Sequence, residues 1–349
     1  MTGIVITAWS ALTPFGHGRA AFADGVRAGR PVDPVSTSDE WGTADACLVP
    51  DFDIVEQLGR KGTSSMDRTS ALAVATLRGL QRDEDGSHAP DPRTGVVLGT
   101  TSGSAATQFA FTRDSLTRRK PYFVNPAQMP FALMNSAAAQ CAMWHGLAGP
   151  NSTIAAGRGA ATAVLRYAGR LLRTGRASGV FAGAVEEHSG ARELLEQGQR
   201  LGEASGMFFL QTADAGNRPV LAEVVALTTR IGEPRRALAE SLRQALAGCR
   251  PADVWGLASV GAPELSEVEH EAAVEVLGQR VGTVVQPGQL VGDTGAASGV
   301  LGVAALLALA EVDASARGRL AVTTSVDRDG TAGCVVLRLA GSSHQARGD

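Results

Sequence analysis

The sequence predicts an α/β layered fold made of two similar halves. Apolar runs typical of buried strands, such as Thr94–Leu98 and Gly179–Val185, alternate with segments of helical periodicity along the chain. The second half repeats this rhythm without a visible sequence repeat, so we expect halves at residues 1–200 and 201–340. With 349 residues, 44% of them hydrophobic, the chain can fill two domains or one large double domain. A polar, disordered tail is expected at residues 341–349.

In the first half, each expected element follows from a local pattern. Gly3–Thr7 is a short apolar strand, and Thr94–Leu98 is a buried strand that enters a loop of small residues. Helical periodicity predicts helices at Ala105–Arg119 and Ala132–Trp144. His145 and the glycine after it are typical of a helix stop.

The second half shows the same alternation. Met207–Gln211 and Val220–Thr228 are expected to pair directly as neighbouring strands. Helices are expected at Glu233–Ala247, Leu265–Gly278 and Ala297–Leu309. Further strands are expected at Val254–Ser259, Thr283–Gln286, Leu320–Ser325 and Gly333–Leu339.

Charge and composition argue against several classes of function. The 32 Lys and Arg balance 35 Asp and Glu without a basic cluster, which argues against nucleic acid as a partner. The longest apolar run, Val300–Ala310, is too short to span a bilayer, and the N-terminus has no signal-peptide pattern, so a cytoplasmic protein is expected. The 4 cysteines and 6 histidines lack metal-ligand spacing. We therefore expect no membrane partner, no metal and no cofactor.

A strand, a tight turn and a helix are predicted together in residues 149–161. The strand ends near Ala155, small residues form the turn around Arg158, and the helix continues through Ala168. In enzymes, a turn of this kind exposes a nucleophilic Ser or Cys at the N-terminus of a helix.

This segment resembles the active-site elbow of the β-ketoacyl synthases (ketosynthases), which carry a nucleophilic cysteine where Arg158 stands here. Four further segments resemble the family in the same order along the chain: residues 4–16, 176–187, 201–207 and 293–299. The resemblance implies a thiolase-type fold that works as a dimer. In this fold, two duplicated α/β halves form a five-layered α-β-α-β-α core.

The resemblance also implies that the catalytic groups are lost. The two catalytic histidines of the family correspond to Val260 and Asp293, its lysine to Gly288, and its gating loop to residues 327–330. An arginine at the elbow is not a nucleophile, and a valine cannot donate a hydrogen bond to an oxyanion. The chain is therefore not expected to catalyse condensation by itself.

Two of these replacements have opposite charge. Arg158 and Asp293 stand where groups of the family converge on one pocket, so we expect them to form a buried ion pair. A cation at a helix N-terminus is disfavoured by about 0.3–1 kcal/mol, so it needs an anion beside it. Asp327 or Asp329 is the alternative partner.

The inactive relatives within the family are the chain length factors, which pair with an active ketosynthase in type II polyketide synthases. Residues 108–116 resemble the chain length factor helix that lines the polyketide tunnel. Phe109, Thr112 and Leu116 share one face of this helix, and Leu133 belongs to the segment that crosses the interface. These four are the expected tunnel residues. The alternative is that they are ordinary core residues.

By the same resemblance, one strand is expected to pair across the dimer interface through Ser152, Thr153, Ile154 and Ala155. The implied partner is an active ketosynthase subunit. An acyl carrier protein that bears the polyketide chain would reach the complex through that partner.

Two other functions stay open. The chain could be an autonomous thiolase-fold acyltransferase that uses Asp293 or Arg158, or a homodimeric structural pseudoenzyme. Chain length factors of aromatic systems commonly carry glutamine at the elbow, and the stretch 187–202 is shorter here than in the family. These departures favour a polyene-type or reducing system. Dependence on a co-expressed ketosynthase favours the chain length factor, whereas turnover of a thioester by the isolated chain favours the acyltransferase.

Overall fold

The central feature of the computed structural model is an eleven-stranded sheet made of two five-stranded halves and the short β2 (Gly16–His17). The described residues are 3–83, 91–196, 199–215, 218–278 and 281–341. Across the first half, the strands are β6 (Asn151–Ala155), β5 (Gly95–Thr100), β7 (Val180–Glu186), β8 (Ala204–Thr212) and β1 (Ile4–Thr13). Across the second half, they are β11 (Thr283–Val285), β10 (Val254–Ser259), β12 (Leu320–Val326), β13 (Thr331–Leu339) and β9 (Ala222–Ile231).

The two halves have the same topology. If the strands of each half are numbered 1 to 5 along the chain, their order across the sheet is 3-2-4-5-1 in both halves. The third, second and fourth strands are parallel, and the fifth is antiparallel to both of its neighbours. The halves join where Ile4–Ile6 of β1 pairs with Ala222–Val224 of β9. The predicted duplication is confirmed.

The predicted direct pairing of Met207–Gln211 with Val220–Thr228 is wrong. β8 and β9 lie on opposite sides of β1, which pairs with β8 from Ile4 to Leu12 and with β9 only from Ile4 to Ile6. β1 is longer than predicted and buried at every position, as expected of a strand that has neighbours on both sides and helices on both faces. The chain therefore returns to the other edge of β1 instead of forming a hairpin.

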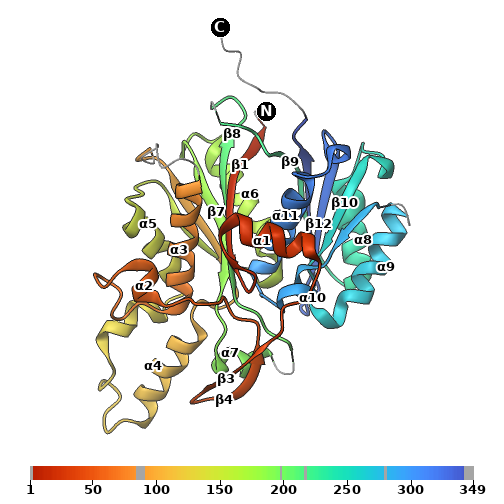
Figure 1. Cartoon of the computed structure of the whole chain (residues 1–349). Helices are drawn as coiled ribbons and strands as arrows, with labels where there is room; N and C mark the ends of the chain where they lie inside the picture. The colour runs from red at the N-terminus through yellow and green to blue at the C-terminus, as the bar shows by residue number, and fades with distance from the viewer. Residues whose placement is uncertain (1–2, 84–90, 197–198, 216–217, 279–280, 342–349) are drawn as a thin grey trace.

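Helices cover both sheet halves and fill the space between them (Figure 1). The outer helices are α3 (Arg68–Asp83) and α5 (Ser136–His145) on the first half, and α8 (Pro234–Ala245) and α9 (Ser266–Leu277) on the second. The central layer consists of α6 (Ala160–Arg173) and α11 (Ala297–Ala310), which contact strands of both halves. α11 is apolar on all sides and buried from Ala297 to Ala308, as a central helix requires. The expected five-layered core is confirmed.

A glycine allows the two central helices to approach closely. A Cβ at Gly299 of α11 would lie only 2.7 Å from the Cβ of Ala161 at the start of α6, so no larger residue fits there without a shift. This approach brings the loop that precedes α11 to the N-terminus of α6.

Smaller elements lie around the five layers. They are α1 (Gly18–Ala28), β3 (Val35–Asp39), β4 (Gly42–Ala46), α2 (Ile54–Leu58), α4 (Ala105–Thr117), η1 (Pro126–Ala132), η2 (Gly157–Gly159), α7 (Gly190–Glu196), η3 (Pro251–Asp253), η4 (Pro263–Leu265), α10 (Pro287–Val291) and η5 (Ala314–Ala316). The helix predicted at Ala132–Trp144 begins only at Ser136, because η1 ends at Ala132 and residues 133–135 form a turn between the two. α4 extends away from the sheet at the lower end of the molecule in Figure 1.

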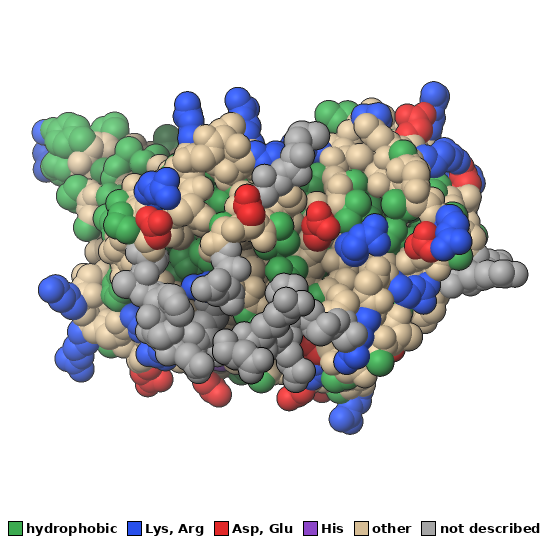
Figure 2. Space-filling view, turned by 90° about the horizontal axis from the view of Figure 1, so that it is seen from above, with side chains coloured by type: hydrophobic (Ala, Val, Ile, Leu, Met, Phe, Trp, Pro, Cys, Tyr) green, Lys and Arg blue, Asp and Glu red, His purple; other side chains and the backbone are tan. Residues whose placement is uncertain are grey.

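The surface features agree with the composition. On the face seen in Figure 2, Lys and Arg side chains are dispersed among Asp and Glu side chains. None of the helices in the described part of the chain has both the length and the apolar character needed to span a membrane. Among the same residues, no group of three or more His, Cys, Asp or Glu could hold a metal ion.

The strand pairing bears on the boundary between the two halves. The boundary between residues 200 and 201 stays a prediction. Because β8 pairs with β7 and β1, we propose that the first half extends to Thr212. The predicted tail, 341–349, lies outside the described residues except for Gly341.

Candidate functional site

The candidate site lies where the N-terminus of α6 meets the loop before α11. β6 ends at Ala155, and the chain turns through η2 before α6 begins. Gly157 has a φ of 47°, a left-handed conformation that favours glycine, and a Cβ there would lie 2.6 Å from Asp327 Oδ2. The predicted strand, turn and helix are present, and Arg158 stands on the turn, buried with 4% of its surface exposed.

Three carboxylates surround the Arg158 guanidinium. Its Nη2 donates to Asp293 Oδ2, and its Nη1 donates to Asp327 Oδ1 at 2.9 Å. Glu196 Oε2, at the end of α7, lies 3.7 Å from Nη2. The predicted ion pair between Arg158 and Asp293 is confirmed, and Asp327 binds the same guanidinium in addition rather than as a substitute. Asp329 instead accepts a hydrogen bond from the backbone N–H of Thr331 at 2.8 Å.

Asp327 also explains how a cation is tolerated at the start of a helix. Its Oδ2 accepts the backbone N–H of Arg158 at 3.0 Å, so a carboxylate lies at the positive end of the α6 dipole. One polar atom of the cluster stays unmatched within the described residues, because the buried Nε of Arg158 has no acceptor. The arrangement neutralises charge but leaves no free base beside the turn.

Burial and ion pairing act in opposite directions on Asp293. Burial alone would raise the pKa of its carboxyl, but the nearby charges of Arg158 and Arg192 bring the pKa below its usual value. Arg192 is itself buried and donates to the backbone carbonyls of Glu187, Gly202 and Asp293. The Asp293 carboxylate is thus paired with Arg158 and further stabilised by the nearby charge of Arg192, which makes it a poor proton acceptor.

The ion-pair cluster continues to the surface. Arg328 Nη1 lies 2.8 Å from Glu196 Oε2, and Arg328 Nε donates to Glu264 at the start of η4. The chain of contacts therefore links η2, α7, the β12–β13 turn and η4. Asp293 of this cluster also lines a small cavity in the second half.

That cavity has a volume of about 110 Å³ and brings together Val260, Gly288 and Asp293, the positions that correspond to the family's histidines and lysine. The other lining residues are Ser259, Gly261, Pro263, Ser266, Glu269, Gln286, Gln289 and Ser298. Neither a thiol nor an imidazole is among them. The lining therefore offers hydroxyl, amide and carboxyl groups for hydrogen bonding, but neither the cysteine nor the histidines of a ketosynthase.

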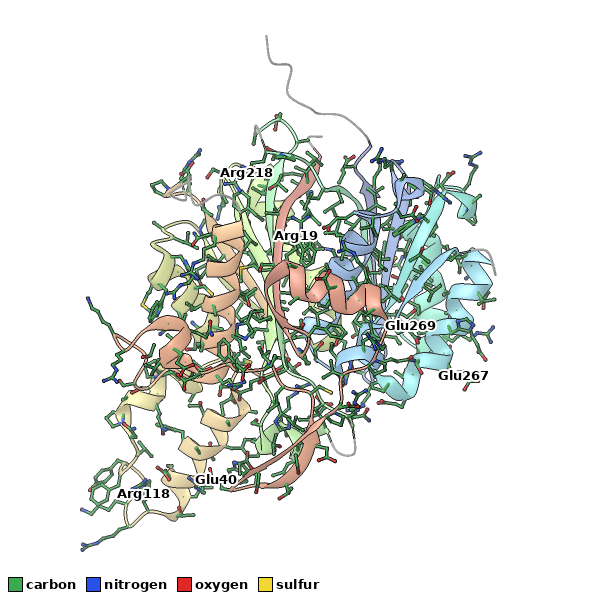
Figure 3. The ribbon with its side chains drawn as sticks, viewed as in Figure 1. Arg19, Glu40, Arg118, Arg218, Glu267 and Glu269 are labelled. Atoms are coloured by element: carbon green, nitrogen blue, oxygen red, sulfur yellow. The ribbon has the colours of Figure 1, made fainter. Side chains whose placement is uncertain are left out.

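Glu269 of α9, labelled in Figure 3, is a buried acid that the sequence reasoning missed. Its carboxyl accepts the backbone N–H groups of Val260 at 3.2 Å and Gly261 at 2.7 Å, and the hydroxyl of Thr324. Burial raises its pKa to about 7. The sequence pattern could have indicated its burial, because Glu269 lies on the apolar face of α9, one turn before Ala272 and Ala273.

A second buried acid lies in the first half, close to the predicted tunnel segment. Glu187 Oε1 accepts the hydroxyl of Ser104 at 3.0 Å and the backbone N–H of Ala106 at 3.2 Å, at the start of α4. Burial, and next the charge of Asp67, raise its pKa to about 7. Because the folded-state pKa lies above the ordinary value of 4.5, this group stabilises the fold at low pH and loses that effect as pH rises through about 7.

We therefore expect Asp67→Asn to stabilise the protein at pH 8 by about 1 kcal/mol and to have little effect at pH 5. Asparagine retains an oxygen to accept the backbone N–H of Ser70, which Asp67 holds at 2.8 Å, but it removes the like charge beside Glu187. Urea unfolding at the two pH values measures the difference. An equal effect at both would contradict the proposed repulsion.

The predicted tunnel residues are not core residues within this chain. Leu116 and Leu133 are 79% and 47% exposed, Thr112 is exposed, and Phe109 is half-buried. The Phe109 ring contacts the ring of Trp41. Their role in a tunnel stays a prediction.

The predicted interface strand is β6, at one edge of the sheet. Among the residues that the structure describes, β6 pairs only with β5, so one row of its backbone groups has no neighbouring strand there. Ser152, Thr153 and Ile154 are half-buried, and Ala155 is exposed. Pairing with a partner across this edge also stays a prediction.

Comparison with known proteins agrees with this fold. The beta-ketoacyl synthase N-terminal domain family matches residues 1–205, more than half of the chain. The fold and the elbow define a thiolase-type protein. The chain belongs to the beta-ketoacyl synthase family.

Individual relatives extend this assignment. The solved structure of the ishigamide ketosynthase/chain length factor is 42% identical, with a TM-score of 0.90, and the match covers 97% of this chain and 100% of that one. A ketosynthase in complex with its chain length factor from Xenorhabdus doucetiae is 17% identical, with a TM-score of 0.77 over 97% of this chain and 98% of that one, a likeness of fold. The 3-oxoacyl-[acyl-carrier-protein] synthase 2 of Vibrio harveyi is 28% identical over 153 residues, which are 43% of this chain and 36% of the relative. The chain thus spans about a third of the length of that curated relative.

Proposed function

We propose that this chain is a non-catalytic chain length factor subunit, which pairs with an active ketosynthase in a type II polyketide synthase and shapes the tunnel that limits chain growth. The observation that carries the proposal is the buried Arg158 at the elbow, bound by Asp293 and Asp327. The structural relative with 42% identity is named as a ketosynthase/chain length factor.

The chemistry of the elbow supports the absence of condensation by this chain alone. A guanidinium carries no lone pair that could attack a thioester, and ion pairs hold it in place. Val260 offers no donor side chain for an oxyanion, and the Asp293 carboxylate is paired with Arg158. The alternative of an autonomous acyltransferase would need Asp293 or Arg158 to leave this cluster.

The surface of the first half supports a partner. Large apolar side chains are exposed on α4, η1, α5 and the segments that join them: Leu116, Tyr122, Phe123, Met129, Leu133, Met134 and Met143. Contiguous exposed apolar surface usually marks an interface. We propose that the active ketosynthase covers it and pairs with the edge of β6. An acyl carrier protein would deliver its chain through that partner.

Co-expression tests this proposal. With active type II ketosynthases from the same genome, we expect a heterodimer whose interface buries more than about 2,000 Å², as in obligate dimers. Sedimentation at micromolar concentration measures the assembly, and mass spectrometry measures the products. A chain that stays monomeric with every ketosynthase, or that forms a stable homodimer, would contradict the proposed function.

Two further measurements separate the alternatives. Turnover of an acyl thioester by the isolated chain would establish the autonomous acyltransferase. Polyene or reduced products from the heterodimer, rather than aromatic ones, would support the reducing type of system that the arginine at the elbow favours.

A further inference from the structure

The tip of the β3–β4 hairpin contacts the helix that carries the predicted tunnel residues. The Trp41 ring meets the Phe109 ring edge-on, with centroids 5.4 Å apart and planes at 86°. The Arg113 guanidinium, one turn further along α4, lies 5.7 Å from the centre of the Trp41 ring. Arg113 also pairs with Glu40, the residue beside Trp41. Both residues of the tip thus bind one face of α4.

The hairpin tip is itself fixed to the body of the molecule. The Asp39 carboxylate accepts the backbone N–H of Trp41 at 2.8 Å and that of Gly190, at the start of α7, also at 2.8 Å. The other end of α7 carries Glu196, which belongs to the Arg158 cluster. A continuous series of contacts therefore runs from the candidate site through α7 and the hairpin to α4.

α4 packs against η1 and α7, and the hairpin tip adds the contacts of Glu40 and Trp41 toward the C-terminal half of the helix. Ser104 and Glu187 hold its N-terminus. At the C-terminal end, Arg118 pairs with Asp114 of the same helix. Figure 3 shows Glu40 and Arg118 at the lower end of the molecule, where α4 extends from the sheet.

We propose that Glu40 and Trp41 are positioning residues for chain length, which fix α4 and the Phe109 ring and thereby set the width of the tunnel. This inference rests on the proposed function of the chain. Positions 109 and 113 lie one helical turn apart and face the hairpin, whereas Thr112 and Leu116 stay exposed for a partner. Loss of the Trp41 ring frees the Phe109 side chain to rotate into or out of the tunnel and lets α4 shift.

The test uses the reconstituted heterodimer with its carrier protein and malonyl units. We expect Trp41→Ala to change the ratio of longer to shorter products by about threefold to tenfold. This factor corresponds to the free energy that one aromatic pair contributes. Trp41→Phe keeps an aromatic edge and should restore the original ratio. Arg118→Gln removes an ion pair on the same helix that does not touch the hairpin, so it serves as the matched control and should leave the ratio unchanged.

A double variant shows whether Trp41 acts through Phe109. If it does, Trp41→Ala adds no further change in the product ratio in the Phe109→Ala background. Hydrogen exchange of the α4 amides in the isolated chain gives a readout without turnover, and exchange should accelerate in Trp41→Ala but not in Arg118→Gln. If Phe109→Ala changes the products and Trp41→Ala changes neither products nor exchange, the positioning role is wrong while the proposed function stands. If Phe109→Ala leaves the products unchanged, α4 does not line the tunnel, and that part of the proposed function is wrong.

Discussion

Arg158→Met is expected to destabilise the fold by about 3–5 kcal/mol, because it leaves the buried Asp293 carboxylate without its main counter-charge. Arg158 and Asp293 are 4% and 3% exposed, so water cannot replace the lost ion pair. Arg192 remains near, but it is committed to backbone carbonyls. Denaturant unfolding at pH 7 measures the loss.

The pH dependence of this loss follows from the lowered pKa of Asp293. In the unaltered protein, its ion pairs stabilise the fold above its usual pKa, and that contribution is lost as pH falls through the lowered folded-state value. In Arg158→Met, burial raises the pKa of Asp293, so the carboxyl takes up a proton as the pH falls from neutral. The difference between the two proteins should therefore be smaller at pH 5 than at pH 7.

A double-mutant cycle separates this pair from its surroundings. Arg158→Met together with Asp293→Leu should cost less than the sum of the two single changes, because apolar groups of similar size leave no unpaired charge between them. Asp327 remains, but its side chain is 18% exposed and can be hydrated. Arg236→Met, at an ion pair on α8 outside the cluster whose arginine side chain is 80% exposed, is the control and should leave the free energy of unfolding nearly unchanged. Strict additivity would reject the coupling.

The duplicated α/β architecture and the elbow could be predicted because they depend on local patterns. Alternating apolar runs and helical periodicity determine the type of each element, and the small residues around Arg158 are typical of a tight turn. The neighbours of β1 could not be predicted, because strand order depends on pairing between distant segments. The start of α5 at Ser136 was also missed, since a short helix, η1, and a turn at residues 133–135 come before it.

The residues of the central ion pair could be predicted from the sequence, but the further contacts around it could not. The opposite charges at positions 158 and 293 indicated an ion pair, which the structure has. That Asp327 would bind both the side chain and the backbone N–H of Arg158 depends on how the β12–β13 turn packs against α6. Trp41 was not identified, because a hairpin tip far away in the sequence meets Phe109 only in the folded chain.

Side-chain volume on α4 should determine how far the acyl chain grows in the heterodimer. We expect Thr112→Trp to shorten the products, since an exposed position on this helix gains a bulky ring that projects into the proposed tunnel. Phe109→Ala should lengthen them, because removal of the ring opens space that packed walls refill only in part. Product mass from the reconstituted complex measures both changes.

Stability distinguishes a narrowed tunnel from a damaged fold. The Phe109 ring is half-buried, so Phe109→Ala should cost less than the about 3–5 kcal/mol that is typical of a core phenylalanine. Thr117→Trp is the matched control for bulk in Thr112→Trp, because Thr117 is exposed and lies about 140° around the helix from Thr112, so it should leave product length unchanged. If the folded heterodimer makes the same products with Phe109→Ala and with Thr112→Trp, this helix face does not line the tunnel. The exposed Leu116 and Leu133 would then serve the interface alone, and chain length would have to be set by the partner.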